Sequence, residues 1–245
     1  MKTATSRNKL AAILLPAAFT CAFASTSQAG EWSANAAMTS NYVWRGLTQT
    51  ENEAAVQGGI DYASDSGFYV GTWASNVNYG SPDAYSYEHD IYAGFAFDTG
   101  AISWDVGYLY YNYDKEAEFD FGEVYLGVGI GGFSAKLNVL ANTEADEAEG
   151  QDFGFGEAHY LSLDYGFEIG NGIAIGLHVG HHDGDFAEAF NGNAEGYYDY
   201  NVTLSKGGFT FMISDTDVKG VAADPQQYSN DQVRFVVSYA VDIAL

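Results

Sequence analysis

Two adjacent histidines and two nearby carboxylates could bind a metal ion. His181, His182, Asp183 and Asp185 occur in the run HHDGD, and imidazole and carboxylate groups are ligands for divalent transition metals. Adjacent histidines are poorly spaced to close around one ion, and the single cysteine, Cys21, is far away in the sequence. We therefore expect this run to start an exposed polar loop. Its four residues are weak metal candidates, and we expect no cofactor.

A serine and a histidine could support hydrolysis by nucleophilic catalysis. Ser162 and His178 fall on neighbouring expected strands, on the polar face of each. A barrel enzyme that hydrolyses lipid would need them on the face toward the lipid. The chain also has no GxSxG motif. We therefore expect no enzymatic activity, and a lipid hydrolase stays as an alternative.

Carboxylates dominate the charge of the chain. It has 33 acidic and 9 basic residues, and a net charge of −24. This balance excludes non-specific binding to nucleic acid, which needs a basic surface. Acidic side chains gather in residues 142–158, 181–195 and 215–231. Such loops at the mouth of a pore would favour cations; they could equally be bridged to lipopolysaccharide by divalent ions.

Residues 1–29 have the features of a secretory signal peptide. Three basic residues precede an apolar run at 10–19, and Ser27 and Ala29 are small residues suited to cleavage after Ala29. The apolar run is too short to span a bilayer core, which takes about 20 residues. We expect residues 1–29 to be a signal peptide and residues 30–245 to form one domain.

After residue 29 the apolar side chains alternate with polar ones. In the last segment, Phe235, Val237 and Tyr239 alternate with Arg234 and Ser238. Successive side chains of a strand point to opposite faces, so each strand has one apolar and one polar face. No stretch has the length and periodicity of a membrane-spanning helix. We expect twelve strands, at residues 32–44, 54–63, 67–76, 87–97, 101–111, 119–130, 133–141, 158–168, 172–180, 196–204, 208–214 and 231–245.

The connections between these strands alternate in length. Short ones rich in Gly, Ser, Asp and Asn are typical of hairpin turns, and they occur at 64–67, 98–101, 131–132, 169–172 and 205–208. The connections between them are long. This alternation is typical of outer-membrane barrels, which have short periplasmic turns and longer outer loops. The sequence predicts an all-β fold: a single 12-stranded antiparallel transmembrane β-barrel with long acidic outer loops.

If the apolar faces contact lipid, the polar faces line the lumen. Arg45 would end the first strand and Arg234 would lie in the last, and these two strands must pair to close the barrel. We expect the two arginines to lie near each other opposite an acidic wall, which would form a constriction with a transverse field. The pore-lining candidates are Arg45, Asp61, Asp90, Asp105, Glu123, Asp164 and Arg234.

The first third of the domain resembles the TorF family of porin-like proteins of proteobacteria. The matching segments are TSNYVWRG at 39–46, AVQGG at 55–59, SGFY at 66–69, Gly71 and Trp73, and SNV at 75–77. DVGYLYY at 105–111 and EVYLGV at 123–128 are also similar to that family. The resemblance implies an outer-membrane barrel and specifies no substrate and no functional residues.

These observations favour a narrow passive channel in the bacterial outer membrane. We expect it to pass small solutes, with a preference for cations, and to contact outer-membrane lipid and lipopolysaccharide. The main alternative is a structural or adhesive barrel with a plugged lumen, whose acidic loops bind partners or divalent ions. A soluble periplasmic β-protein is a further alternative.

Overall fold

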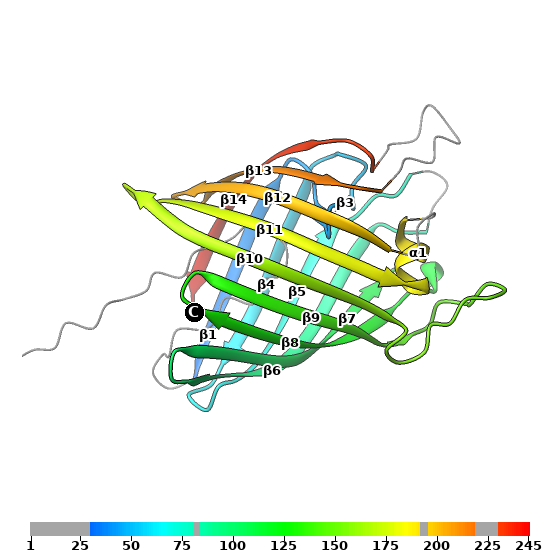
Figure 1. Ribbon diagram of the computed structural model, residues 1–245, viewed down its shortest axis with the longest axis horizontal. Helices are drawn as coiled ribbons and strands as arrows, with labels where there is room; N and C mark the ends of the chain where they lie inside the picture. Colours follow the sequence, from blue (N-terminus) through cyan, green and yellow to red (C-terminus); the bar gives the residue numbers. More distant parts are fainter. Residues whose placement is uncertain (1–29, 81–83, 192–195, 219–229) are drawn as a thin grey trace, which may run out of the picture.

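A closed antiparallel barrel of twelve strands forms the body of the protein (Figure 1). The computed structural model describes residues 30–80, 84–191, 196–218 and 230–245, so the expected signal peptide lies outside the described residues. The predicted fold class is confirmed. The barrel strands are β1 (Glu31–Thr39), β4 (Ala55–Ala63), β5 (Phe68–Asn76), β6 (Tyr87–Thr99), β7 (Ile102–Tyr113), β8 (Phe121–Ile130), β9 (Phe133–Thr143), β10 (Ala158–Gly170), β11 (Ile173–Gly184), β12 (Gly196–Lys206), β13 (Phe209–Thr216) and β14 (Arg234–Ala244).

The first and last strands close the barrel. β1 pairs with β4 on one side and with β14 on the other, so that Asn35 lies opposite both Gly59 and Asp242. Every other strand pairs with its neighbours in sequence order. The barrel therefore has no free sheet edge, the feature that lets a β-structure satisfy its backbone hydrogen bonds within a membrane.

Short and long connections alternate around the barrel, as predicted. The short turns gather at one end and the long connections at the other, where the helix α1 (Asp185–Asn191) also lies (Figure 1). In the turn from β12 to β13, Gly207 and Gly208 both have positive φ. Two-residue hairpin turns need that conformation, which glycine adopts without steric cost. The long end also carries a short 3₁₀ helix, Lys115–Ala117.

The outer wall of the barrel is apolar. On β14, Phe235, Val237 and Tyr239 are exposed, whereas the alternating Arg234 and Ser238 are buried toward the interior. Among the described residues, no helix is long and apolar enough to cross a membrane. An apolar outer wall around a polar interior is the reverse of a soluble barrel, and it suits a bilayer.

Two expected boundaries are wrong. The strand expected at 32–44 ends at Thr39, and the chain then leaves the barrel wall. The strand expected at 172–180 continues to Gly184, so the HHDGD run belongs to β11 and the first position of α1 instead of starting a loop. In both places contacts with the rest of the barrel, described below, decide the conformation.

The apolar wall leads to a first prediction. Leu126 lies in the middle of β8 and its side chain is 49% exposed on the outer wall. Leu126→Arg should lower the free energy of unfolding in lipid vesicles by about 2–4 kcal/mol, since that is the cost of an arginine near the bilayer midplane. The measurement is urea unfolding followed by tryptophan fluorescence.

Phe155 provides the matched control, because it is 70% exposed in the long connection between β9 and β10. Phe155→Arg should change the free energy of unfolding by no more than about 1 kcal/mol, as at a membrane interface. Equal losses for the two variants would contradict the placement of the outer wall in lipid.

Candidate functional site

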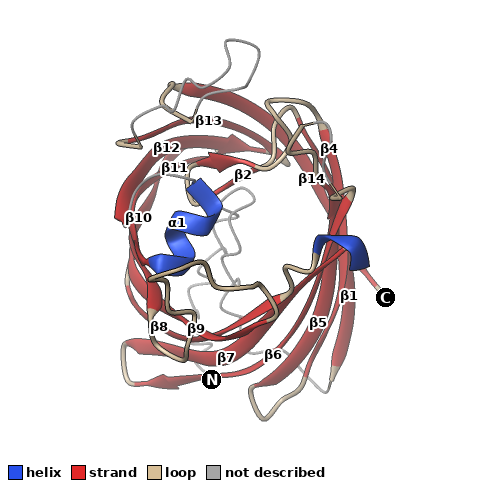
Figure 2. Ribbon diagram, turned by 90° about the vertical axis from the view of Figure 1, so that its right-hand side faces the viewer, coloured by secondary structure: helices blue, strands red, loops and turns tan. Residues whose placement is uncertain are grey.

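A segment between β1 and β4 folds into the barrel instead of extending away from it. Residues 40–54, here called the inner hairpin, contain the short strands β2 (Val43–Trp44) and β3 (Leu47–Thr48), which pair with each other. Every residue from 41 to 50 is buried. Viewed along the barrel, β2 and α1 lie within the ring of strands (Figure 2). The inner hairpin therefore occupies part of the lumen.

The tip of the inner hairpin is a two-residue turn. Arg45 has φ of 46° and Gly46 has φ of 77°, and a tight type I′ hairpin turn needs positive φ at both positions. Arginine adopts this conformation at a cost of roughly 1–2 kcal/mol. Contacts of the Arg45 side chain must offset that cost.

Local hydrogen bonds allow the inner hairpin to be buried. The side chain of Asn41 accepts a hydrogen bond from the hydroxyl of Thr48 (2.6 Å) and donates one to Asn52 (3.0 Å). The backbone N–H of Tyr42 donates to the hydroxyl of Thr50 at 3.1 Å. A buried loop is tolerated only when its polar backbone groups find such partners.

Arg45 lies at the centre of the interior. Its Nη2 donates to both carboxylate oxygens of Glu123, at 2.8 and 2.6 Å, and its Nη1 is 3.2 Å from Nε2 of His182. The guanidinium also lies over the rings of Trp44 (4.1 Å) and Tyr160 (4.3 Å). Burial by itself would lower the pKa of Arg45, but the charge of Glu123 outweighs it and holds the pKa above its usual value. Arg45 is therefore cationic.

Glu123 comes from β8 on the barrel wall, and it is itself well satisfied. Besides Arg45, it accepts hydrogen bonds from the Tyr111 hydroxyl (3.4 Å) and the Asn138 amide (3.0 Å). Arg45 and Glu123 are 7% and 4% exposed. This ion pair therefore joins the tip of the inner hairpin to the far wall, out of contact with bulk water.

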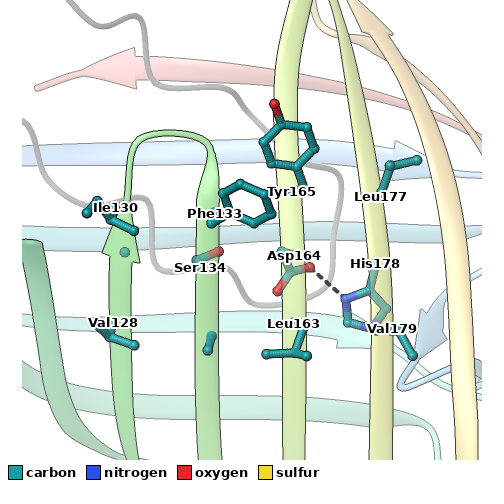
Figure 3. Close-up of a pocket in the computed structure, with 12 residues that line it drawn as sticks. Val128, Ile130, Phe133, Ser134, Leu163, Asp164, Tyr165, Leu177, His178 and Val179 are labelled. Carbon is teal, nitrogen blue, oxygen red and sulfur yellow. Dashed lines mark hydrogen bonds and ion pairs between the residues drawn. The ribbon is translucent and has the colours of Figure 1, made fainter.

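A second charged cluster lies on β10–β12. Nδ1 of His178 is 2.6 Å from Asp164, and its Nε2 is 2.9 Å from Asp199 (the Asp164 contact is drawn in Figure 3). The Tyr160 hydroxyl donates to Asp199 at 3.0 Å. Since the Tyr160 ring also lies under Arg45, the two clusters are in contact. Both nitrogens of His178 are held by carboxylates, which leaves neither as a base for Ser162 on the neighbouring strand.

Two further acidic candidates, Asp61 and Asp105, lie toward the short turns; Asp90 lies on β6 nearer the long connections and is described below. Asp61 is half-buried and accepts hydrogen bonds from the Tyr92 hydroxyl and the Asn35 amide. Asp105 is 4% exposed and accepts a hydrogen bond from the Tyr69 hydroxyl at 2.5 Å. Each carboxylate has a tyrosine donor and faces the interior.

The two arginines both reach the inner hairpin, but from different elements. Arg45 is part of the inner hairpin and not of the first strand, so this expectation is wrong. Arg234 is the first residue of β14, and it donates to the side chains of Asn52 (3.2 Å) and Asn230 (2.7 Å) and to the carbonyl of Gly46 (3.3 Å). Arg45 instead pairs with the acidic wall at Glu123. Arg234 therefore holds the backbone of the turn that carries Arg45.

The HHDGD residues do not converge. His182 faces the interior and contacts Arg45, whereas His181 faces outward and packs against Tyr198, with ring centres 4.3 Å apart. Successive residues of a strand point to opposite faces, so the two imidazoles cannot hold one ion. Among the described residues, no three His, Cys, Asp or Glu side chains form a metal-binding group.

Aromatic side chains gather in the interior at the end that carries the long connections. The ring of Phe186 on α1 lies 5.4 Å from Phe119, 5.1 Å from Phe121 and 5.2 Å from Phe153. Phe121 in turn lies 6.5 Å from Trp44 of the inner hairpin. Three long connections and the inner hairpin thus share one aromatic cluster. The polar alternation did not reveal this cluster, because its members come from loops as well as strands.

A shallow groove lies on the outer wall, next to the strands that carry the second charged cluster. It crosses the short-turn end of β8–β11, where Val128, Phe133, Leu163 and Leu177 line it (Figure 3). Its lining is mostly the outward-facing apolar set that covers the rest of the wall, together with Asp164 and His178 from the second charged cluster. The interior, and not this groove, is the candidate functional site.

The sequence of the chain matches a known protein family. A family model described as "Bacterial protein of unknown function (Gcw_chp)" matches residues 23–242. The chain belongs to this family. The finer resemblance to the TorF family stays an expectation. No protein of curated function matches the chain.

Solved porins share the fold of this Gcw_chp protein at low sequence identity. The KdgM porin superposes with a TM-score of 0.53 at 10% identity, covering 87% of this chain and 99% of the porin. The NanC porin gives a TM-score of 0.52 at 8% identity, covering 87% of this chain and 98% of the porin. A further KdgM structure, described as a complex with disordered oligogalacturonate, gives a TM-score of 0.51 at 10% identity, covering 88% and 99%. These likenesses establish a porin-like barrel fold.

The Arg45–Glu123 pair leads to a second prediction. Arg45→Met leaves Glu123 buried without its cation, and Glu123→Gln leaves Arg45 without its anion. Each should lower the free energy of unfolding by about 3–5 kcal/mol, since removing one partner of a buried pair leaves an uncompensated charge. The double variant should lose less than the sum of the two, as measured by urea unfolding in lipid vesicles.

Lys206→Met is the control, because Lys206 is exposed near a short turn and its removal should cost about 0.5 kcal/mol or less. Losses that simply add in the double variant would show that Arg45 and Glu123 act independently.

Proposed function

We propose that the protein is an outer-membrane channel for the passive diffusion of small polar solutes, with a preference for cations. The observation that carries this proposal is a closed barrel with an apolar outer wall and an interior rich in carboxylates. The porin-like fold supports the channel. The expected signal peptide and the apolar wall support a location in the outer membrane, in contact with lipid and lipopolysaccharide. The same features favour a non-enzymatic role.

The charge of the interior supports the preference for cations. Among the described residues, inward-facing carboxylates outnumber the inward-facing lysine and arginine residues, which are Arg45, Lys136 and Arg234. Lys136 lies over the ring of Tyr125 at 3.8 Å. A low-dielectric wall strengthens the field of fixed charges, so a carboxylate-rich lumen attracts cations and repels anions. The proposed pore-lining residues are Arg45, Asp61, Asp90, Asp105, Glu123, Asp164 and Arg234.

The inner hairpin favours a second candidate function. Leu47 at its tip is 2% exposed and Trp44 is 8% exposed, so this part of the lumen is filled by side chains. A barrel that stays filled would be structural or adhesive, and its acidic loops would bind partners or divalent ions. In the channel proposal the same hairpin sets how far the lumen opens.

The test is single-channel recording of the refolded chain in a planar bilayer under a salt gradient. We expect discrete conductance steps and a reversal potential of the sign given by cation selectivity. Folding is checked independently by the heat-dependent shift in gel mobility that closed barrels show. A correctly folded but silent protein would favour the filled barrel, and anion selectivity would contradict the role of the carboxylates.

Gly46 leads to a third prediction. A Cβ atom at this position would clash with the side chains of Thr216 and Asp199 on the barrel wall. Gly46→Ala should therefore displace the tip of the inner hairpin while the twelve barrel strands stay paired. We expect a higher single-channel conductance than that of the wild type.

Gly131→Ala is the matched control. Gly131 also has positive φ (60°), but a Cβ there would have no atom within 4 Å, since it lies in a short turn. This variant bears similar backbone strain without the clash, and its conductance should equal that of the wild type. Equal conductance of Gly46→Ala and Gly131→Ala would refute a role of the inner hairpin in limiting the pore.

A further inference from the structure

One buried carboxylate of the interior has no hydrogen-bond partner. Asp90 on β6 is completely buried, and neither of its carboxylate oxygens accepts a hydrogen bond. Thr72 donates to the backbone carbonyl of Asp90 (2.9 Å) and not to its side chain. An unpaired carboxylate in such a place costs several kcal/mol, so buried carboxylates are found paired, neutralised or bound to a metal ion.

A second buried carboxylate lies on the same face of the same strand. Glu88 is two residues before Asp90 and is 1% exposed. It accepts hydrogen bonds from the hydroxyls of Tyr42 (2.7 Å) and Tyr113 (3.0 Å), which are neutral donors. Tyr111 is the cross-strand neighbour of Asp90, and its hydroxyl donates to a third buried carboxylate, that of Glu123, at 3.4 Å. Asp90 therefore lies within an acidic cluster.

The charge of Arg45 is already balanced by Glu123. Arg45 gives its Nη2 to Glu123, and no described basic residue forms an ion pair with Glu88 or Asp90. Within this cluster, Glu88 and Asp90 remain once the Arg45–Glu123 pair is set aside. If both are ionised, a charge of +2 balances them.

We propose that Asp90 and Glu88 hold a divalent, oxygen-binding cation of the calcium type inside the barrel. Cα atoms two residues apart on a strand are separated by about 6.6 Å, and side chains of different length can converge on one ion from there. Calcium accepts carboxylates together with neutral oxygens in an irregular shell. The described residues supply no third acidic or imidazole ligand here, so tyrosine hydroxyls or water complete the shell.

The surroundings of Asp90 suit such an ion. Trp73 on β5 and Tyr111 on β7 are its cross-strand neighbours, and both are aromatic. They exclude bulk water and lower the local dielectric, which strengthens the attraction between a carboxylate and a cation. The cation would also be linked to the inner hairpin, because Tyr42 belongs to that hairpin and donates to Glu88.

The test compares the full chain refolded in calcium with the chain refolded in EDTA at matched ionic strength. We expect calcium to raise the unfolding temperature of the wild type, since a ligand that binds only the folded state stabilises it. Asp90→Asn should abolish this increase. Terbium, which replaces calcium and is sensitised by nearby Trp and Tyr, should bind Asp90→Asn at least about tenfold more weakly than the wild type.

Asp146→Asn is the control for binding at the surface, because Asp146 is exposed in the acidic connection between β9 and β10. It should keep the calcium-dependent increase. If Asp90→Asn does not fold, Glu88→Gln provides the same test. A wild type that unfolds at one temperature in calcium and EDTA, or an increase that persists in Asp90→Asn, would overturn the proposal. So would an equal increase with sodium in place of calcium. None of these readings depends on channel activity.

Discussion

A charged side chain inside a barrel must find an opposite charge there, and the Arg45–Glu123 pair meets that requirement for the inner hairpin. Because Arg45 is fixed at 2.6 Å from a carboxylate on the far wall, the turn that carries it can adopt positive φ and stay buried. Trp44 and Tyr160 then lie against the guanidinium, and Tyr160 connects this pair to the cluster around His178. Much of the interior is arranged around one cation.

The barrel itself could be predicted from the sequence because its signals are local. Alternation along a strand and turn residues between strands are properties of short segments, and they correctly indicated twelve strands and the alternating connections. The inner hairpin depends on contacts between distant residues, such as Arg45 with Glu123 and Tyr42 with Glu88, which no local pattern contains. One signal was present: Arg45–Gly46 lies between apolar Trp44 and Leu47, as in a two-residue hairpin turn. The apolar alternation in residues 32–44 continues beyond the polar pair Ser40–Asn41, so it favours one long strand and hides this turn.

The same contrast between local patterns and distant contacts decides which candidate residues could be predicted. Side chains on barrel strands, such as Asp105 and Glu123, face the interior as the period of two requires. The adjacent positions of His181 and His182 suggest a shared metal site, but neighbouring residues of a strand point to opposite faces of the barrel wall. Glu88 lies inside the expected strand at 87–97 and two residues before Asp90, so the alternation predicts that both side chains face the lumen. Its importance comes from Tyr42 of the inner hairpin, a partner that only the three-dimensional fold provides.

The inner hairpin leaves and rejoins the wall at a single rung of the barrel. Thr39, the last residue of β1, is paired with Ala55, the first residue of β4. The hairpin is therefore a loop whose two ends are already held together, and its position places no demand on the register of any strand. The barrel wall and the inner hairpin are thus structurally separate parts of one chain. In the proposed channel, insertions, deletions or exchanges within residues 40–54 would reshape the passage without changing the strand pairing around it, so one barrel would suit solutes of different size.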